Sequence, residues 1–192
     1  MRRRYTAPMP ARQSLPFLWL LSDARNDAAL ETALRALPPG SGFVFRHHHL
    51  EPEARRERFD SLAVYARASN DRIVLILAGS ADDARDWGAQ GTYGNPARQS
   101  AADGLLRLAT AHCGAELKAA EQSGADGVFL SPVFATRSHH LAQPLGIHGF
   151  HVLAQQSAVP VIALGGMTKA RAAELNWPRW GAIDGLVSPT AR

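Results

Sequence analysis

The segment that decides the fold reads GADGVFLSPVFATRSHHLAQPLGIHGFHVLAQQSAVPVIALGGMT and spans residues 124–168. It predicts a buried strand at Asp126–Ser131, then a polar loop, then a helix at Ile147–Gln156. A second apolar strand follows at Val159–Leu164. A strand, a helix and another strand in this order are typical of the βα units from which parallel sheets are built.

The second strand ends at Gly165 and Gly166, just before the next helix. Glycines let backbone N–H groups approach a ligand closely, and the start of a helix adds partial positive charge, so this place can bind an anion. A Gly-Gly pair also fits an ordinary turn between a strand and a helix. Its position after a late strand of a repeating pattern favours the anion site.

The same alternation of short apolar runs and helical stretches extends from Pro16 onward, and it predicts an α/β fold. Strands are predicted at Phe17–Leu21, Gly42–Arg46, Ile73–Ala78, Gly91–Tyr93, Leu105–Thr110, Asp126–Ser131, Val159–Leu164 and Trp180–Ile183. Helices are predicted at Asp27–Leu37, Pro52–Ala68, Ala81–Trp87, Gly114–Gln122, Ile147–Gln156 and Lys169–Leu175. Eight strands fit a compact (β/α)8 TIM barrel, with an open doubly wound sheet as the runner-up.

With 192 residues the chain is short for this barrel, so some helices must be reduced. Residues 94–104 leave little room for a helix after strand four, and about nine residues remain after strand eight. We therefore expect short or missing helices after strands 4 and 8. Residues 1–15 are predicted to form a basic flexible tail, and residues 16–192 a single barrel domain. The tail or a partner subunit could cover the gap after strand eight, which leaves a homo-oligomer open.

The composition is that of an ordinary globular domain, with 46% hydrophobic and 20% charged residues. The single cysteine rules out an internal disulfide framework and suits a reducing compartment. The net charge is +4, but no basic patch with interleaved aromatic residues occurs, so no nucleic-acid partner is expected. The apolar run FLWLL is too short for a secretory signal, and no run approaches a membrane span. We expect a cytoplasmic protein without a membrane partner.

In a TIM barrel, side chains at the carboxyl ends of the strands converge on the active site. The strand ends therefore supply the candidates. They are Arg46 and His48 after strand two, Thr110 and His112 at strand five, Thr136, Ser138 and His139 after strand six, Gly165 and Gly166 after strand seven, and Asp184 and Gly185 after strand eight.

Histidines are frequent among these segments, which raises the question of a metal site. However, residues 47–49 are consecutive, so alternate side chains of an extended segment point to opposite faces. No helical pair of histidines four residues apart occurs, and no cysteine joins the set. Anion recognition or acid–base work suits them better, because imidazole titrates near neutral pH.

The blocks SPVFATRSHH, PLG and PVIALGGMT resemble the thiamine phosphate synthase / TenI family of thiamine biosynthesis. The resemblance is clearest over residues 110–168 and extends more weakly from Phe17 to Leu186. It implies a (β/α)8 barrel and a small phosphorylated heterocycle, a thiazole phosphate, as the ligand.

Against this family, the residues that would hold magnesium and a diphosphate are altered. Arg46 keeps a family arginine, but His48 stands where a lysine is usual, and His139 replaces the lysine after strand six. Ala78-Gly79 stands where the family has Asn-Asp, and residues 94–97 offer no carboxylate after strand four. We therefore expect no metal and no cofactor, with Mg²⁺ required only if the chain is a synthase.

The phosphate end of the site is retained in this resemblance. Gly165 and Gly166 match the family's paired glycines, and residues 182–186 resemble the segment that closes the phosphate site. Thr110-Ala111-His112 resembles the TenI branch, in which a histidine at this place moves a proton during isomerisation of a carboxythiazole phosphate. The resemblance thus favours a TenI-like thiazole tautomerase with His112 as general acid/base. The alternatives are a thiamine phosphate synthase with an altered diphosphate site, and a catalytically silent phosphate-ligand-binding regulator.

Overall fold

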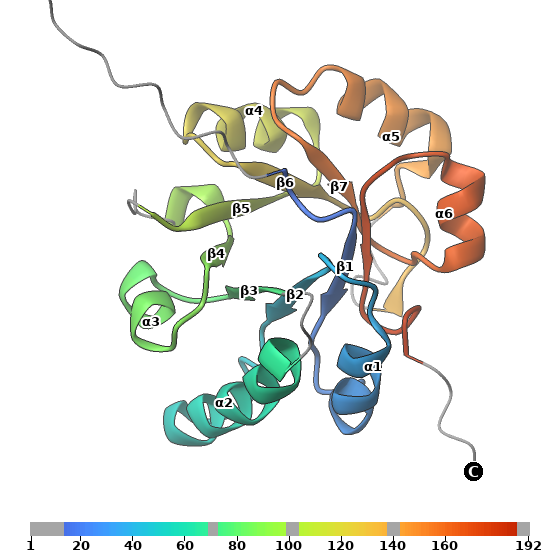
Figure 1. The fold of residues 1–192 in the computed structure, drawn as a ribbon. Helices are drawn as coiled ribbons and strands as arrows, with labels where there is room; N and C mark the ends of the chain where they lie inside the picture. The colour runs from blue at the N-terminus through green and yellow to red at the C-terminus, as the bar shows by residue number, and fades with distance from the viewer. Residues whose placement is uncertain (1–13, 69–72, 99–103, 138–142, 188–192) are drawn as a thin grey trace, which may run out of the picture.

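The computed structural model describes residues 14–68, 73–98, 104–137 and 143–187. Its eight strands are parallel and close into a barrel in sequence order (Figure 1). The strands are β1 (Leu18–Leu21), β2 (Gly42–Phe45), β3 (Val74–Leu77), β4 (Gly91–Gly94), β5 (Leu106–Ala111), β6 (Gly127–Leu130), β7 (Val161–Ala163) and β8 (Trp180–Ala182). The helices are η1 (Asp27–Ala29), α1 (Leu30–Ala36), α2 (Pro52–Ala68), α3 (Ala81–Asp86), η2 (Pro96–Arg98), α4 (Gly114–Gln122), α5 (Gly146–Gln155) and α6 (Lys169–Leu175).

The first strand closes the barrel because it pairs with both β2 and β8. Trp19 lies opposite Gly42 on one side and Gly181 on the other. Its indole ring is fully buried, and a Cβ atom at Gly42 would overlap that ring. Small residues on both neighbouring strands therefore make room for one large side chain. The β1–β8 pairing confirms the predicted barrel and excludes the open sheet.

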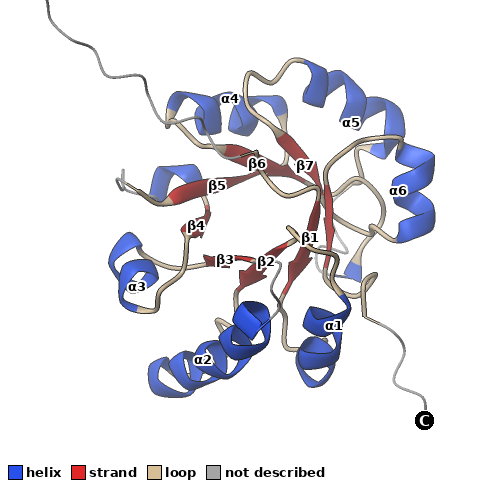
Figure 2. Cartoon of the chain, in the orientation of Figure 1, coloured by secondary structure: helices blue, strands red, loops and turns tan. Residues whose placement is uncertain are grey.

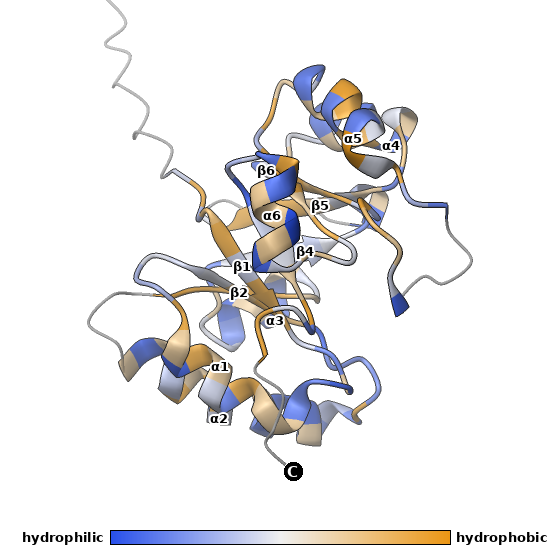
Figure 3. Ribbon diagram, turned by 90° about the vertical axis from the view of Figure 1, so that its right-hand side faces the viewer, coloured by the Kyte–Doolittle hydropathy of each residue, from blue (hydrophilic) through white to orange (hydrophobic). Residues whose placement is uncertain are grey.

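The strands form the inner ring and the helices the outer ring (Figure 2). Inside the barrel lies one apolar cluster that includes Trp19, Val44, Ile76, Leu108, Phe129 and Ile162. Two further clusters fill the space between the sheet and the helices, one under α1 and α2 and one under α4, α5 and α6. Most strands are accordingly apolar, although β4 carries Thr92 and β5 carries Arg107 and Thr110, whereas the helices carry both apolar and polar residues (Figure 3).

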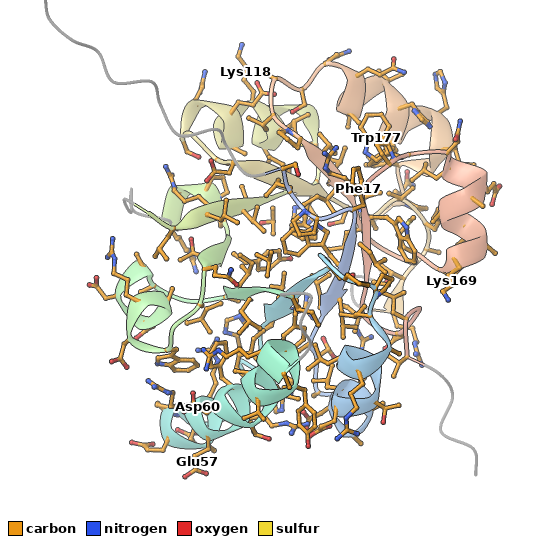
Figure 4. All side chains as sticks on the ribbon, viewed as in Figure 1. Phe17, Glu57, Asp60, Lys118, Lys169 and Trp177 are labelled. Atoms are coloured by element: carbon orange, nitrogen blue, oxygen red, sulfur yellow. The ribbon has the colours of Figure 1, made fainter. Side chains whose placement is uncertain are left out.

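Helix α2 shows why these segments become helices on the barrel surface. Phe59, Leu62, Ala63 and Ala66 recur at helical spacing and are buried against the sheet. Glu57 and Asp60, on the other face, point away from the barrel, as do Lys118 on α4 and Lys169 on α6 (Figure 4). No helix in the described part of the chain is long and apolar enough to cross a membrane.

Several predicted strands extend one or two residues beyond the observed ones. Strand β2 ends at Phe45 because the N–H of Arg46 turns to the hydroxyl of Ser22, 2.8 Å away, and Arg46 enters the loop. The predicted first helix begins as the 3₁₀ turn η1 before α1. Between β4 and β5, the described residues contain only the 3₁₀ turn η2. After β8, residues 183–187 form bends and turns. These are the two places where the sequence predicted reduced helices.

Candidate functional site

A cavity of about 580 Å³ opens at the carboxyl ends of the strands, and we call it the main cavity. This volume is in the usual range for small-molecule sites. Its lining combines segments that follow β2, β4, β5, β6, β7 and β8. Among its lining residues are the predicted positions Arg46, Thr110, His112, Thr136, Gly165, Gly166, Asp184 and Gly185.

Three predicted positions are not part of this described lining. The side chain of His48 is exposed in the loop after β2, and His48 is not among the described residues that line the main cavity. Ser138 and His139 lie outside the described residues. Their predicted contacts with a ligand stay predictions.

The two glycines after β7 have backbone conformations that suit few other residues. The φ angle is +93° at Gly165 and +64° at Gly166. A Cβ atom at Gly165 would lie 2.6 Å from the Cα atom of Pro132, so the loops after β6 and β7 are in close contact. Among the described residues, none accepts a hydrogen bond from the N–H of either glycine. Two adjacent donors thus border the main cavity without a protein acceptor.

The loop after β8 completes this side of the cavity. Gly185 packs against the backbone of Met167 so closely that a Cβ atom would overlap the Met167 carbonyl oxygen. Asn26 fixes the end of β8 from the other side, because its side-chain amide donates to the carbonyl oxygens of Leu21 (3.0 Å) and Ile183 (2.8 Å). The loops after β7 and β8 therefore form one closely packed wall of backbone groups.

Sequence reasoning missed two arginines that line the same wall. Arg171 Nη1 donates to the carbonyl oxygen of Gly166 at 2.5 Å, and its guanidinium lies 5.0 Å from the ring centre of Phe134. Arg137 Nη2 donates to the carboxylate of Asp184 at 3.0 Å. The signals were present: Arg137 directly follows Thr136 in the quoted loop, and Arg171 lies in the first turn of α6. Arg171 thus places positive charge beside the glycines, whereas the charge of Arg137 lies beside the Asp184 carboxylate.

Arg46 supplies positive charge on the opposite side of the main cavity. Its Nε donates to the carbonyl oxygen of Ser22 (2.8 Å) and its Nη2 to Asp23 (2.6 Å). Burial opposes the ionisation of Asp23, but hydrogen bonds from Arg25 and the charges of Arg25 and Arg46 outweigh it and lower the pKa of Asp23. Tyr93 lines the cavity nearby, and burial raises the pKa of its hydroxyl group. The Tyr93 hydroxyl is therefore a neutral hydrogen-bonding group at neutral pH.

His112 lies where β5 gives way to α4, and it lines the main cavity. One carboxylate oxygen of Glu116 accepts a hydrogen bond from the backbone N–H of His112 (2.7 Å) and contacts its ring Nδ1 (2.9 Å). The His112 side chain is 44% exposed, so solvent and ligand can reach it. The hydrogen bonds from His112 lower the pKa of Glu116, which is therefore ionised at neutral pH.

His47, in the run of three histidines, is buried rather than facing the cavity. Its Nδ1 contacts the Ser22 hydroxyl and its Nε2 contacts Asp27, each at 2.8 Å. Its ring is stacked on Phe45, with the ring centres 4.8 Å apart. Burial lowers its pKa, and the charges of His49 and Arg58 act in the same direction while Asp27 opposes them. His47 thus belongs to the packing below the site.

The residues at the ends of β2 and β3 do not fit a magnesium ion. Ala78 and Gly79 offer no side-chain oxygen, and Mg²⁺ requires carboxylate or similar oxygen ligands. The guanidinium of Arg55 donates to the carbonyl oxygens of Arg46 (3.0 Å) and Ala78 (2.7 Å), so a positive charge already lies at these ends. Across the described residues, no group of three or more His, Cys, Asp or Glu side chains could hold a metal.

Comparisons with a family model and with individual relatives point to one family. The family described as thiamine monophosphate synthase (TMP-TENI) matches residues 18–177. A thiamine-phosphate synthase of Chlorobium phaeobacteroides is 27% identical over 80% of this chain and 78% of its own length. One of Chloroflexus aurantiacus is 33% identical over 64% of this chain and 55% of its own. A relative from Aquifex aeolicus is 44% identical over 59 residues, 32% of its length.

The fold is also that of solved structures. A thiamine phosphate pyrophosphorylase from Pyrococcus furiosus superposes with a TM-score of 0.72. The superposition covers 88% of this chain and 86% of that one at 21% identity. The chain therefore shares the barrel of that protein, while it matches only about a third to a half of the length of the Aquifex and Chloroflexus relatives.

Proposed function

This chain belongs to the thiamine monophosphate synthase and TenI family, and we propose that it binds a thiazole phosphate in the main cavity and isomerises it by proton transfer at His112. The observation that carries the proposal is the shared lining of one cavity. An imidazole, a pair of glycines and three arginines all line a volume suited to one small molecule.

The phosphate end of the ligand is assigned to the wall formed by Gly165, Gly166 and Gly185. Phosphate oxygens are hydrogen-bond acceptors, and the N–H groups of Gly165 and Gly166 are donors without a described protein acceptor. Arg171, whose guanidinium contacts Gly166, adds positive charge beside them. Because phosphate is held by backbone groups and arginine, no metal is needed for this part of binding.

The heterocycle is assigned to the centre of the cavity, within reach of His112. In an isomerisation, a C–H bond of the ligand breaks and its electron pair enters the heterocycle. The histidine carries the proton and returns it to a different atom of the ligand, so charge and atoms balance. Imidazole suits both steps because its proton affinity lies near neutral pH. Arg46 could neutralise a carboxylate carried by the heterocycle.

A thiamine phosphate synthase is the second candidate, because the curated relatives carry that name. Its reaction couples a pyrimidine diphosphate to a thiazole phosphate, and release of the diphosphate calls for a bound cation. Ala78, Gly79 and the guanidinium of Arg55 stand where that cation would be required. The same phosphate wall would serve the thiazole phosphate in either reaction.

The two activities are separated by one pair of assays on the purified protein. The first follows isomerisation of a carboxythiazole phosphate, and the second follows coupling of the thiazole phosphate with the pyrimidine diphosphate, with Mg²⁺ and with chelator. We expect isomerisation that chelator does not change, and little coupling. Robust coupling that chelator abolishes would establish the synthase instead. Binding without either reaction would establish the silent binder.

A further inference from the structure

Glu116 makes two contacts with His112 through a single carboxylate oxygen. That oxygen lies 2.7 Å from the backbone nitrogen of His112 and 2.9 Å from its ring Nδ1. Glu116 is in the first turn of α4, four residues after His112. The backbone bond alone would suffice to satisfy a donor near the helix start. The bond to the ring is an additional contact that the start of a helix does not require.

The second contact determines which ring nitrogen carries the proton in neutral His112. An ionised carboxylate can only accept hydrogen bonds, so the ring nitrogen that faces it must be Nδ1–H. The hydrogen bonds from His112 lower the pKa of Glu116, which keeps the carboxylate in this acceptor form. Nε2 then carries the lone pair that can accept a proton from a ligand.

The cavities beside His112 and Glu116 agree with these separate roles of Nδ1 and Nε2. A second cavity of about 390 Å³ lies between η2 and α4, and its lining includes Thr110, His112 and Glu116. His112 lines both cavities, whereas Glu116 lines the second and is not among the described residues of the main cavity. The carboxylate thus holds the imidazole from the side away from the proposed ligand.

We propose that Glu116 is the positioning residue of His112: by accepting Nδ1–H it fixes the tautomer and orientation in which Nε2 transfers the proton. This inference rests on the proposed function, because it assigns a role to Glu116 in that same proton transfer. Holding one tautomer removes the need to reorganise the ring before each proton transfer. The carboxylate also stabilises the imidazolium that forms when Nε2 takes up the proton.

Two variants separate positioning from helix capping. Glu116→Gln keeps a carbonyl oxygen for the backbone N–H of His112 but loses the charge and can present an N–H group to the ring. Glu116→Ala removes both contacts. Glu174→Gln, on the exposed face of α6, is the matched control for loss of one carboxylate. Circular dichroism and thermal melting test whether each variant is folded. If Glu116→Ala does not fold, Glu116→Gln is the decisive variant.

The first readout is the tautomer of His112, from the side-chain ¹⁵N shifts of histidine-labelled protein at a pH where the ring is neutral. The His112→Asn variant identifies the His112 resonance. We expect the Nδ1–H form in the wild type and in Glu174→Gln, and a mixture or the Nε2–H form in both Glu116 variants. An unchanged tautomer in Glu116→Ala would overturn the proposal.

The second readout is isomerisation of the carboxythiazole phosphate. We expect kcat to fall at least about 10-fold in Glu116→Gln and further in Glu116→Ala, but by less than in His112→Asn, where removal of the acid/base itself should cost about 100- to 10,000-fold. KM should change little, because Glu116 does not line the described main cavity. If the wild type is active and kcat is unchanged in Glu116→Ala, the proposed role of Glu116 is overturned but the proposed function is not. A wild type that binds thiazole phosphate but does not isomerise its carboxylated form would overturn the proposed function, and the role of Glu116 with it.

Discussion

The α-carbon of Gly166 lies so close to the carbonyl oxygen of Ala135 that a Cβ atom there would stand only 2.5 Å from that oxygen. The φ angle of +64° at Gly166 is also unfavourable for a residue with a side chain. The loop after β7 is therefore held in a conformation that only glycine fits, and this conformation leaves its N–H groups at the main cavity.

Gly166→Ala should accordingly disturb both stability and binding. We expect the free energy of unfolding to fall by about 1–3 kcal/mol, from backbone strain and the displaced loop. We expect thiazole phosphate affinity, measured by calorimetry, to fall at least about 10-fold. Gly149→Ala is the control, because its new Cβ atom would make only ordinary contact, 3.7 Å from Leu145, and an alanine in a helix stabilises by about 0.5–1 kcal/mol. Equal affinity in the two variants would contradict the assigned phosphate wall.

Arg171→Gln should weaken binding without abolishing proton transfer. The side chain of Arg171 contributes a positive charge beside the glycines and a hydrogen bond to Gly166. Hydrogen bonds to charged groups contribute about 1.5–3 kcal/mol, so we expect affinity for the phosphorylated ligand to fall about 10- to 100-fold. Lys118→Gln, on the outward face of α4, removes the same charge far from the proposed wall and should leave affinity unchanged (Figure 4). Turnover at saturating ligand should fall much less than affinity.

His112→Asn, in contrast to Arg171→Gln, should reduce the isomerisation rate much more than the affinity for the ligand. Asparagine cannot exchange a proton near neutral pH, so we expect the isomerisation rate to fall about 100- to 10,000-fold. Affinity for the ligand should stay within a small factor, because the phosphate wall is intact. His148→Asn, an exposed histidine on α5, is the control and should retain the wild-type rate. A His112→Asn variant that isomerises the ligand at the full rate would contradict the assignment of His112 as the acid/base.

The stability of the protein should depend on pH through buried His47. Its pKa in the folded state lies below the ordinary value of 6.5, chiefly because of burial. The unfolded chain therefore binds more protons than the folded protein below about pH 6.5, and the free energy of unfolding should decrease as the pH falls from 7 to 5. The same change should be smaller in His47→Asn, which tolerates the φ angle of +35° at this position. Urea unfolding at several pH values measures both slopes, and equal slopes would contradict this assignment.

The carboxylate of Glu31 should affect the free energy of unfolding at a lower pH than His47 does. The hydrogen bond from Arg58 lowers the pKa of Glu31, so its stabilising contribution is present above its ordinary pKa and is lost as the pH falls below it. Because this loss comes below about pH 4.5, it does not overlap the pH 7 to 5 window assigned to His47.

Much of the fold could be predicted from the sequence because most strands are apolar and the turns between them are marked by glycine and polar residues. The segment 124–168 predicted β6, α5 and β7 in the right order, with ends that differ by one or two residues. These ends are set by loop contacts, such as the bond from the Arg46 N–H to Ser22, which no local pattern reveals.

The residues that line the main cavity could be predicted where they lie at strand ends. His112 and Gly165 line one cavity because the barrel brings the ends of β5 and β7 to the same face. Arg171 and Glu116 were missed, since each lies in the first turn of a helix rather than at a strand end. His48 was predicted to bind substrate from its place in the chain. The left-handed backbone at His47 alters the direction of the segment, and the His48 side chain is exposed.

A crystal structure of the protein soaked with thiazole phosphate tests the central claim most directly. The account predicts the phosphate oxygens within hydrogen-bond distance of the backbone nitrogens of Gly165 and Gly166, with the heterocycle beside the Nε2 atom of His112. A phosphate bound elsewhere, or a His112 ring that turns away from the bound heterocycle, would contradict it.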